Sequence, residues 1–183
     1  MISYFRINNW EASIKTTELE YVLLGLVSIN DFSGYDVKKI FDKSYIIRWS
    51  ASPGSIYPAL KRLEKRGLLK SKKIMDGKIP KEVYSITDEG KTKIKEWLKE
   101  PFKGTAITRF GLELKLLFLH NLTKDERVNF LKKQIEEINK CIDNLPKWKM
   151  EMDVKNRYRD LLYEEKLREF KQNIKFLEAL LEI

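Results

Sequence analysis

The hydrophobic pattern of the first third of the chain has helical spacing, and capping signals divide it into three short helices. A Ser or Thr followed three residues later by an acid can form a capping box, in which each side chain accepts a hydrogen bond from the other residue's backbone amide. Proline is also favoured in the first turn of a helix, because its missing amide would have no partner there. These signals stand at Thr17 and Glu20, at Ser33 and Asp36, and at Ser52 and Pro53. Three consecutive helices are therefore expected between residues 17 and 67.

Directly after the predicted third helix, the sequence pattern changes from a helical period to a period of two residues, which is typical of a β-strand. Residues 68–75 alternate along the chain, Asp76 and Gly77 form a hairpin signal, and residues 83–86 resume a strand. A fourth helix is expected to start at Thr87. Three compact helices followed by a two-stranded ribbon predict a winged helix-turn-helix.

The second half of the chain is expected to be entirely helical. Behind a capping box at Thr123 and Glu126, apolar residues step by three and four over nearly three heptads, which is typical of a coiled-coil seam. Pro146 is expected to interrupt this helix, and a last helix to run over about 150–182. One helical hairpin offers too little surface to cover both seams, so a homodimer is expected. Its predicted contacts are Val128, Leu131, Ile135, Ile138, Ile142, Phe170, Ile174 and Leu177.

The elements divide the chain into an N-terminal arm (1–16), a winged helix-turn-helix domain (17–103) and a helical dimerisation domain (104–183). The fold class is therefore mainly α with a small β wing, followed by a coiled-coil-like helical region. The longest apolar run, residues 21–27, is far shorter than the roughly 20 residues of a membrane helix. With no apolar stretch near the start that would suit a signal peptide, a cytoplasmic protein without a membrane partner is expected.

The net charge of +9 is concentrated in the predicted third helix and wing. Residues 61–81 contain nine Lys or Arg against two acids, so this window carries +7 and the rest of the chain carries +2. A focused basic surface favours a polyanionic partner, here double-stranded DNA. The alternative is an architectural or interaction module in which the winged helix binds protein and the basic wing is only solvated.

The inventory of reactive side chains argues against an enzyme. The chain has one cysteine, Cys141, and one histidine, His120, which excludes a His/Cys zinc site and makes a Cys–His nucleophile improbable. No phosphate-cradling glycine loop or other metal-ligand cluster is visible. We therefore expect no catalytic residue, no metal and no cofactor.

Several short motifs follow one another within about residues 17–100 in a characteristic order. They are Leu24-Gly25-Leu26, Ser33-Gly34-Tyr35-Asp36-Val37, Gly54-Ser55-Ile56-Tyr57-Pro58-Ala59-Leu60 and Gly77-Lys78-Ile79-Pro80. On these motifs the chain resembles the PadR family of bacterial transcriptional regulators, and its added helical half resembles the longer subclass in pattern. Glu82 departs from the family, because relatives often have a base at this position.

The resemblance implies a dimeric repressor that binds an inverted-repeat operator. The third helix would enter the major groove, whose width fits a helix, and the wing lysines would contact phosphates. Arg62 is the candidate for reading a base, and packing roles for Tyr35 and Tyr57 remain open. The expected DNA contacts are Tyr35, Lys38, Ser55, Tyr57, Lys61, Arg62, Lys72, Lys73, Lys78 and Lys81.

The resemblance also implies release by a small aromatic or cationic amphiphilic ligand. Trp97 lies on the helix that joins the two predicted domains, where some relatives place a ligand-stacking tryptophan. The alternative is that Trp97 is a core residue.

Overall fold

A computed structural model describes residues 16–44, 51–77, 79–104, 107, 109–151 and 157–183. Residues 1–15 of the predicted N-terminal arm lie outside these ranges, and so does Lys78 of the predicted DNA contacts.

The three N-terminal helices begin where the capping signals predict. They are α1 (Glu18–Ile29), α2 (Gly34–Lys43) and α3 (Pro53–Lys65). Both expected capping boxes are present, at Thr17 and Glu20 and at Ser33 and Asp36. At α3 the N-cap residue is Ser52, but its side chain makes no capping hydrogen bond, so the proline in the first turn is the signal that operates there.

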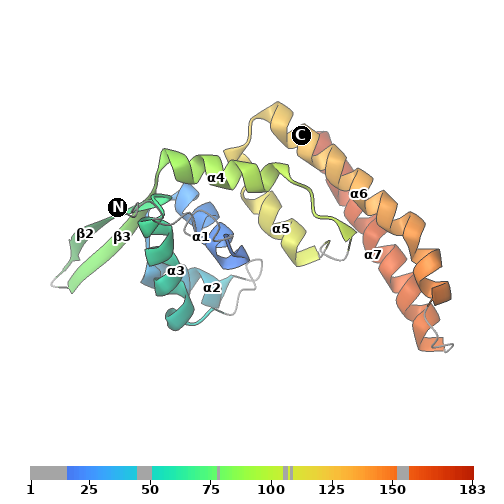
Figure 1. Cartoon of the computed structure of the whole chain (residues 1–183), viewed down its shortest axis with the longest axis horizontal. Coiled ribbons are helices and arrows are strands. Elements are labelled where there is room, and N and C mark those ends of the chain that lie inside the picture. The colour runs from blue at the N-terminus through green and yellow to red at the C-terminus, as the bar shows by residue number, and fades with distance from the viewer. Residues whose placement is uncertain (1–15, 45–50, 78, 105–106, 108, 152–156) are drawn as a thin grey trace, which may run out of the picture.

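A β-hairpin follows α3 and forms the predicted wing. Its strands β2 (Leu69–Asp76) and β3 (Ile79–Ile86) pair in antiparallel fashion along their whole length. Gly77 in the turn has φ +64°, which glycine adopts without the steric cost of a Cβ. The hairpin projects from the three-helix unit at one end of the molecule (Figure 1).

A third strand, β1 (Phe32–Ser33), pairs with the other edge of β3, so the sheet order is β1-β3-β2. The sequence pattern does not predict a strand here, because residues 30–34 carry local turn signals. Phe32 lies opposite Tyr84, and a partner so distant in sequence leaves no local pattern.

One apolar core joins α1, α2, α3, the sheet and α4 (Asp88–Lys99). The face of α3 that points into this core has the spacing expected from the sequence, with 0% exposure at Ile56, Ala59, Leu60 and Leu63. The opposite side of α3 faces solvent. The winged helix-turn-helix prediction is therefore confirmed.

The rest of the chain is helical, as expected. It forms α5 (Arg109–Leu117), a 3-10 helix (Leu119–Asn121), α6 (Lys124–Glu151) and α7 (Arg157–Leu181). Helices α6 and α7 lie side by side as a long hairpin at the end of the molecule opposite the wing, and α4 lies between the two ends (Figure 1). None of the helices in the described ranges is long and apolar enough to cross a membrane.

The prediction that Pro146 interrupts the helix is wrong. Helix α6 continues through it to Glu151, and the last helix starts at Arg157 rather than near residue 150. Pro146 is exposed, while its neighbour Leu145 is only 8% exposed. Proline costs an internal helix about 3 kcal/mol, so packing of α6 along α7 outweighs that cost here.

The two predicted seams are largely filled within one chain. Leu131 and Ile138 of α6 and Phe170 and Leu177 of α7 are buried in the core of the hairpin. The remaining four predicted dimer contacts are partly buried: Val128, Ile135, Ile142 and Ile174. Four of the eight predicted dimer contacts are thus covered within one chain, and the other four keep part of their surface exposed, so dimerisation through these residues stays a prediction.

Close packing at Gly25 connects α1 with the segment after α5. The ring of Phe118, which is 0% exposed, lies so near that a Cβ on Gly25 would be 2.5 Å from its Cδ2 atom. At the C-terminal end of the same helix, Asn121 donates a hydrogen bond to the Ser28 hydroxyl, 2.9 Å away. These contacts attach the helical half directly to the winged helix.

The substitution Gly25→Ala should therefore lower the free energy of unfolding by roughly 1–3 kcal/mol, because the new methyl overlaps a buried ring. Gly54→Ala is the matched control, since the nearest atom to its Cβ would be the Ser52 hydroxyl at 3.5 Å. Urea denaturation of both variants measures the difference. Equal stability of the two variants would contradict the close approach at Phe118.

Candidate nucleic-acid interface

Three elements meet in one exposed surface, which we call the α2–α3–wing surface: the N-terminal end of α2, the exposed side of α3, and the hairpin β2–β3. Lys81 of β3 lies 3.0 Å from the Asp36 carboxylate of α2, and Lys61 of α3 lies 2.6 Å from the Glu82 carboxylate of β3. Tyr57 of α3 packs on the first residue of α2. The sequence motifs that predicted DNA contacts are thus brought together in space.

The two predicted tyrosines remain available on this surface. Tyr35 is 61% exposed, with the Lys39 ammonium 5.5 Å from its ring centre. Tyr57 is 46% exposed although its ring packs on α2, where a Cβ on Gly34 would lie 2.4 Å from its Cε1 atom. Glycine at position 34 is therefore what lets Tyr57 lie across the start of α2 and still face solvent.

Lys38 and Ser55, two further predicted contacts, interact within their own helices. Lys38 pairs with Asp42 one turn later. The Ser55 hydroxyl donates to the backbone oxygen of Ser52, 2.9 Å away. The same Ser52 oxygen also accepts from the backbone amides of Ser55 and Ile56, so this bond leaves the N-terminal amides of α3 without a side-chain cap.

Lys61 is engaged by acids of the wing and of its own helix. Its ammonium lies 2.6 Å from Glu82 Oε1 and 3.0 Å from Glu64 Oε2. Hydrogen bonds to Glu82 and Glu64 raise the pKa of Lys61, and the ammonium in turn contributes to the lowered pKa of both carboxylates. All three groups are therefore charged at neutral pH.

Arg62, the predicted base-reading residue, contacts a buried acid of α1. Its Nε atom donates to Glu20 Oε1 at 2.8 Å, and Glu20 is 1% exposed. Arg66 donates to the other oxygen of Glu20 at 3.3 Å and to the Thr16 hydroxyl at 2.7 Å. Glu20 thus closes the α1 capping box and also holds the C-terminal part of α3 against α1.

Some basic residues of the wing form ion pairs with acids, and others do not. Lys81 contacts Asp36 at 3.0 Å and Asp76 at 3.8 Å, and Lys72 lies 3.7 Å from Asp31. Lys73 is exposed and forms no ion pair with any carboxylate in the described part of the chain. The sequence window of +7 is therefore partly neutralised by acids that lie outside it.

Trp97 is partly buried and packs against the core. Its ring stacks on Tyr21 of α1, with centroids 4.9 Å apart and an interplanar angle of 10°. The ammonium of Lys115 lies over the same ring, 4.7 Å from its centroid. Both contacts favour a core role for this tryptophan over a ligand platform.

Lys115 itself is a buried cation that the sequence analysis did not single out. It is 2% exposed, surrounded by the rings of Trp97, Phe102 and Phe130, and it donates to the backbone oxygens of Trp97 and Glu100 at the end of α4. Burial lowers its pKa to about 8. No periodicity rule finds such a residue, because a lysine in an amphipathic helix normally faces solvent.

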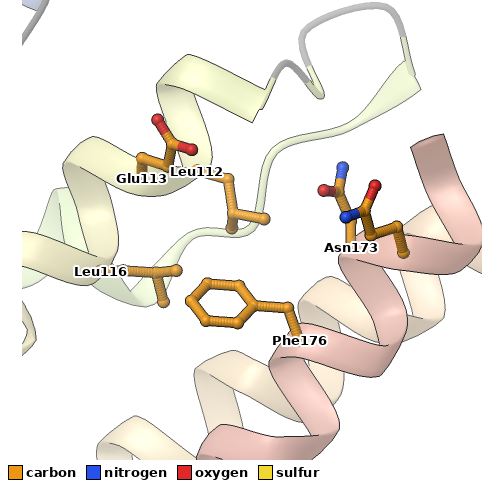
Figure 2. Close-up of a pocket in the computed structure, with 6 residues that line it drawn as sticks. Leu112, Glu113, Leu116, Asn173 and Phe176 are labelled. Carbon is orange, nitrogen blue, oxygen red and sulfur yellow. The ribbon is translucent and has the colours of Figure 1, made fainter. Parts of the chain in front are cut away.

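A cavity of about 200 Å³ lies between α5 and α7. Figure 2 shows Phe176 of α7 pointing toward Leu112 and Leu116 of α5, with Asn173 one turn away. Asn173 is 7% exposed, and its amide nitrogen has no hydrogen-bond partner among the described residues. Trp97 is not part of this cavity. In the described part of the chain, no cluster of His, Cys, Asp or Glu is suited to hold a metal ion.

The fold and this surface define a winged helix-turn-helix protein with an exposed third helix and a projecting wing. The family model described as "Transcriptional regulator PadR-like family" matches residues 23–96. The chain belongs to this family of transcriptional regulators. The match includes α2, α3 and both strands of the wing.

The chain is also similar to individual regulators. The chain is 33% identical to the negative transcriptional regulator PadR of Bacillus subtilis over 122 residues, which span 65% of this chain and 66% of that relative. The crystal structure of Bacillus subtilis PadR in complex with operator DNA is 27% identical, covers 91% of this chain and 98% of its own, and has a TM-score of 0.45. For the same protein in complex with p-coumaric acid, the identity is 26%, the coverages are 89% and 93%, and the TM-score is 0.40.

The lowered pKa of Lys115 predicts a pH dependence of stability. Between about pH 8, where folded Lys115 titrates, and its ordinary value of 10.5, the unfolded chain still binds the proton that the folded chain has lost. The free energy of unfolding should therefore rise with pH in this window, by about 1.4 kcal/mol per pH unit.

Urea denaturation of wild type and Lys115→Met between pH 7 and 10.5 measures this contribution. The difference between the two proteins removes the effect of other titrating groups. A difference that stays constant across the window would contradict a depressed pKa at Lys115.

Proposed function

We propose that this protein is a dimeric transcriptional repressor that binds an inverted-repeat DNA site and is released by a small aromatic ligand. The α2–α3–wing surface carries the proposal. Its buried face holds α3 rigidly, its outer face presents exposed tyrosines, and the wing extends exposed lysines beyond the helix. A relative is described as a negative regulator and has been solved with operator DNA and with p-coumaric acid, which supports the same role for this chain.

The proposed DNA contacts differ in their role according to where they lie on the α2–α3–wing surface. Helix α3 would enter the major groove, with Tyr57 facing the DNA and Tyr35 contacting the backbone beside it. Lys72 and Lys73 on the wing would contact phosphates, which position a protein on DNA rather than select a sequence. Arg62 is the weaker candidate for base readout, because its Nε atom already donates to Glu20.

A second copy of the chain would complete the binding unit. Helix α7 presents Tyr158, Leu161 and Leu162 on one face, with exposures of 76%, 50% and 62%. An exposed apolar face of this kind marks an association surface. In a two-fold dimer, two α3 helices would meet half-sites about 34–36 Å apart, which requires an inverted repeat.

The ligand would act in the helical half of the protein. Trp97, the predicted site, already contacts Tyr21 and Lys115. The cavity between α5 and α7 offers apolar side chains from both helices beside Glu113 and Gln172, and the unpartnered amide nitrogen of Asn173 can donate to an oxygen of a small aromatic molecule.

Selection of bound sequences from a random DNA pool, followed by mobility shifts at physiological salt, tests the function. An enriched inverted repeat, and its release by p-coumaric acid as the first ligand probe, is the expected result. If no sequence is enriched over the starting pool, the protein is not a sequence-specific regulator.

The pair Lys72→Ala and Lys73→Ala should weaken binding to the selected and to random DNA by the same factor. The slope of log affinity against log salt concentration should also become shallower, by about 0.9 for each phosphate that the wing no longer neutralises. The matched control is Lys171→Ala with Lys175→Ala, which removes the same charge from α7. An unchanged salt slope in the wing variant would exclude an interaction of the wing with phosphate.

Light scattering at micromolar concentration should give twice the mass of one chain for wild type. Leu162→Glu should yield single chains, because it places a charge in the exposed apolar face of α7. Lys175→Glu, an exposed substitution on the same helix, is the control and should remain dimeric. A wild type with the mass of one chain would remove the dimer from the proposal.

A further inference from the structure

The junction between α3 and the wing carries more negative than positive charge. Two carboxylates, Glu64 of α3 and Glu82 of β3, flank the single ammonium of Lys61. This junction lies in the middle of a surface proposed to face a polyanion. Electrostatic complementarity alone would place bases here, so the two acids need a separate explanation.

Donors other than Lys61 hold the Glu82 carboxylate in place. The Tyr84 hydroxyl donates to Glu82 Oε2 at 2.9 Å, and the Ser71 hydroxyl lies 3.0 Å from Glu82 Oε1. Ser71 also donates to Glu64, which ties the strand β2 to the same cluster. Because Tyr84 is 1% exposed and fixed in the core, its hydroxyl keeps Glu82 at the junction.

Lys61 is the most exposed member of the ion-pair cluster. Its side chain is 54% exposed, against 31% for Glu82 and 29% for Glu64. The ammonium could reach a phosphate only by leaving two carboxylates, and it would then leave two unneutralised acids beside the DNA backbone. Both effects oppose the release of counterions that drives binding of basic proteins to DNA.

We propose that Glu82 is an affinity-limiting residue: it holds Lys61 in an internal ion pair and so weakens contact with the DNA backbone at the α3–wing junction. This inference rests on the proposed DNA-binding function. It makes Lys61, predicted from the sequence as a DNA contact, a base whose charge is not available to phosphate while Glu82 is ionised. The consequence is a lower occupancy of random DNA than the basic composition of the region would produce.

Glu82→Gln tests the proposal with little change of shape, because the amide oxygen can still accept from the Tyr84 hydroxyl at the Oε2 position, while the uncharged NH2 group takes the position of Oε1 beside Lys61. The variant should bind random duplex DNA about threefold to tenfold more tightly at low salt, and its log–log salt slope should be steeper by about 0.9, the value for one additional neutralised phosphate. Urea denaturation of the variant establishes that it is folded.

Glu96→Gln is the matched control. It removes one carboxylate that pairs with Lys93 on α4, 3.1 Å away, and so changes the net charge equally without touching the junction. It should leave DNA affinity within about twofold of wild type, because its charge lies outside the proposed interface. Equal gains in the two variants would mean that only net charge matters, and would overturn the proposal.

A double-mutant cycle with Lys61 distinguishes release of this base from simple loss of repulsion. In wild type, Lys61→Ala should leave the salt slope nearly unchanged, because the paired ammonium contacts no phosphate there, although the two uncovered carboxylates should weaken binding. In the Glu82→Gln background, Lys61→Ala should abolish the gain in salt slope. The same effect of Lys61→Ala in both backgrounds would refute the inference. If wild type binds no duplex DNA even at low salt, the proposed function itself fails; if it binds and the cycle shows no coupling, only this inference fails.

Discussion

The exposed surface of this protein depends on how α3 is held. Four side chains on one side of the helix are fully buried in the core, and this fixes which residues face outward. Two acids from other elements then restrain the helix: Glu20 of α1 binds Arg62 and Arg66, and Glu82 of β3 binds Lys61. Since these acids bind different side chains of α3, α1 and the wing are both tied to the segment proposed to enter the major groove.

A second set of contacts joins this unit to the helical half. Lys115 donates to backbone oxygens at the end of α4, where helix carbonyls lack partners of their own. Gln134 of α6, which is 0% exposed, exchanges two hydrogen bonds with the backbone of Phe102, at 2.8 Å and 3.1 Å. The end of α4 and the segment after it are therefore bonded to α5 and α6, which connects the helical half to the winged helix through buried polar contacts.

Local signals predicted much of the fold. The capping boxes at Thr17 and Ser33, the proline at the start of α3 and Gly77 in the wing turn act through residues within a few positions of each other, so a sequence displays them directly. Two predictions failed where distant packing decided the outcome. Strand β1 exists because it pairs with β3, and α6 passes through Pro146 because it packs along α7.

By itself the sequence determined the order of the first four helices and the two wing strands, the family motifs and the number of bases in residues 61–81. Only the tertiary structure decided which of those bases are available. Glu20 lies 42 positions from Arg62, Asp36 lies 45 from Lys81, and Glu82 lies 21 from Lys61, yet each pair is within hydrogen-bonding distance. A count of charge along the chain does not reveal such partners, because the energy of an ion pair depends on separation in space rather than in sequence. Part of the positive charge in this region is therefore neutralised, in the folded protein, by the protein's own acids.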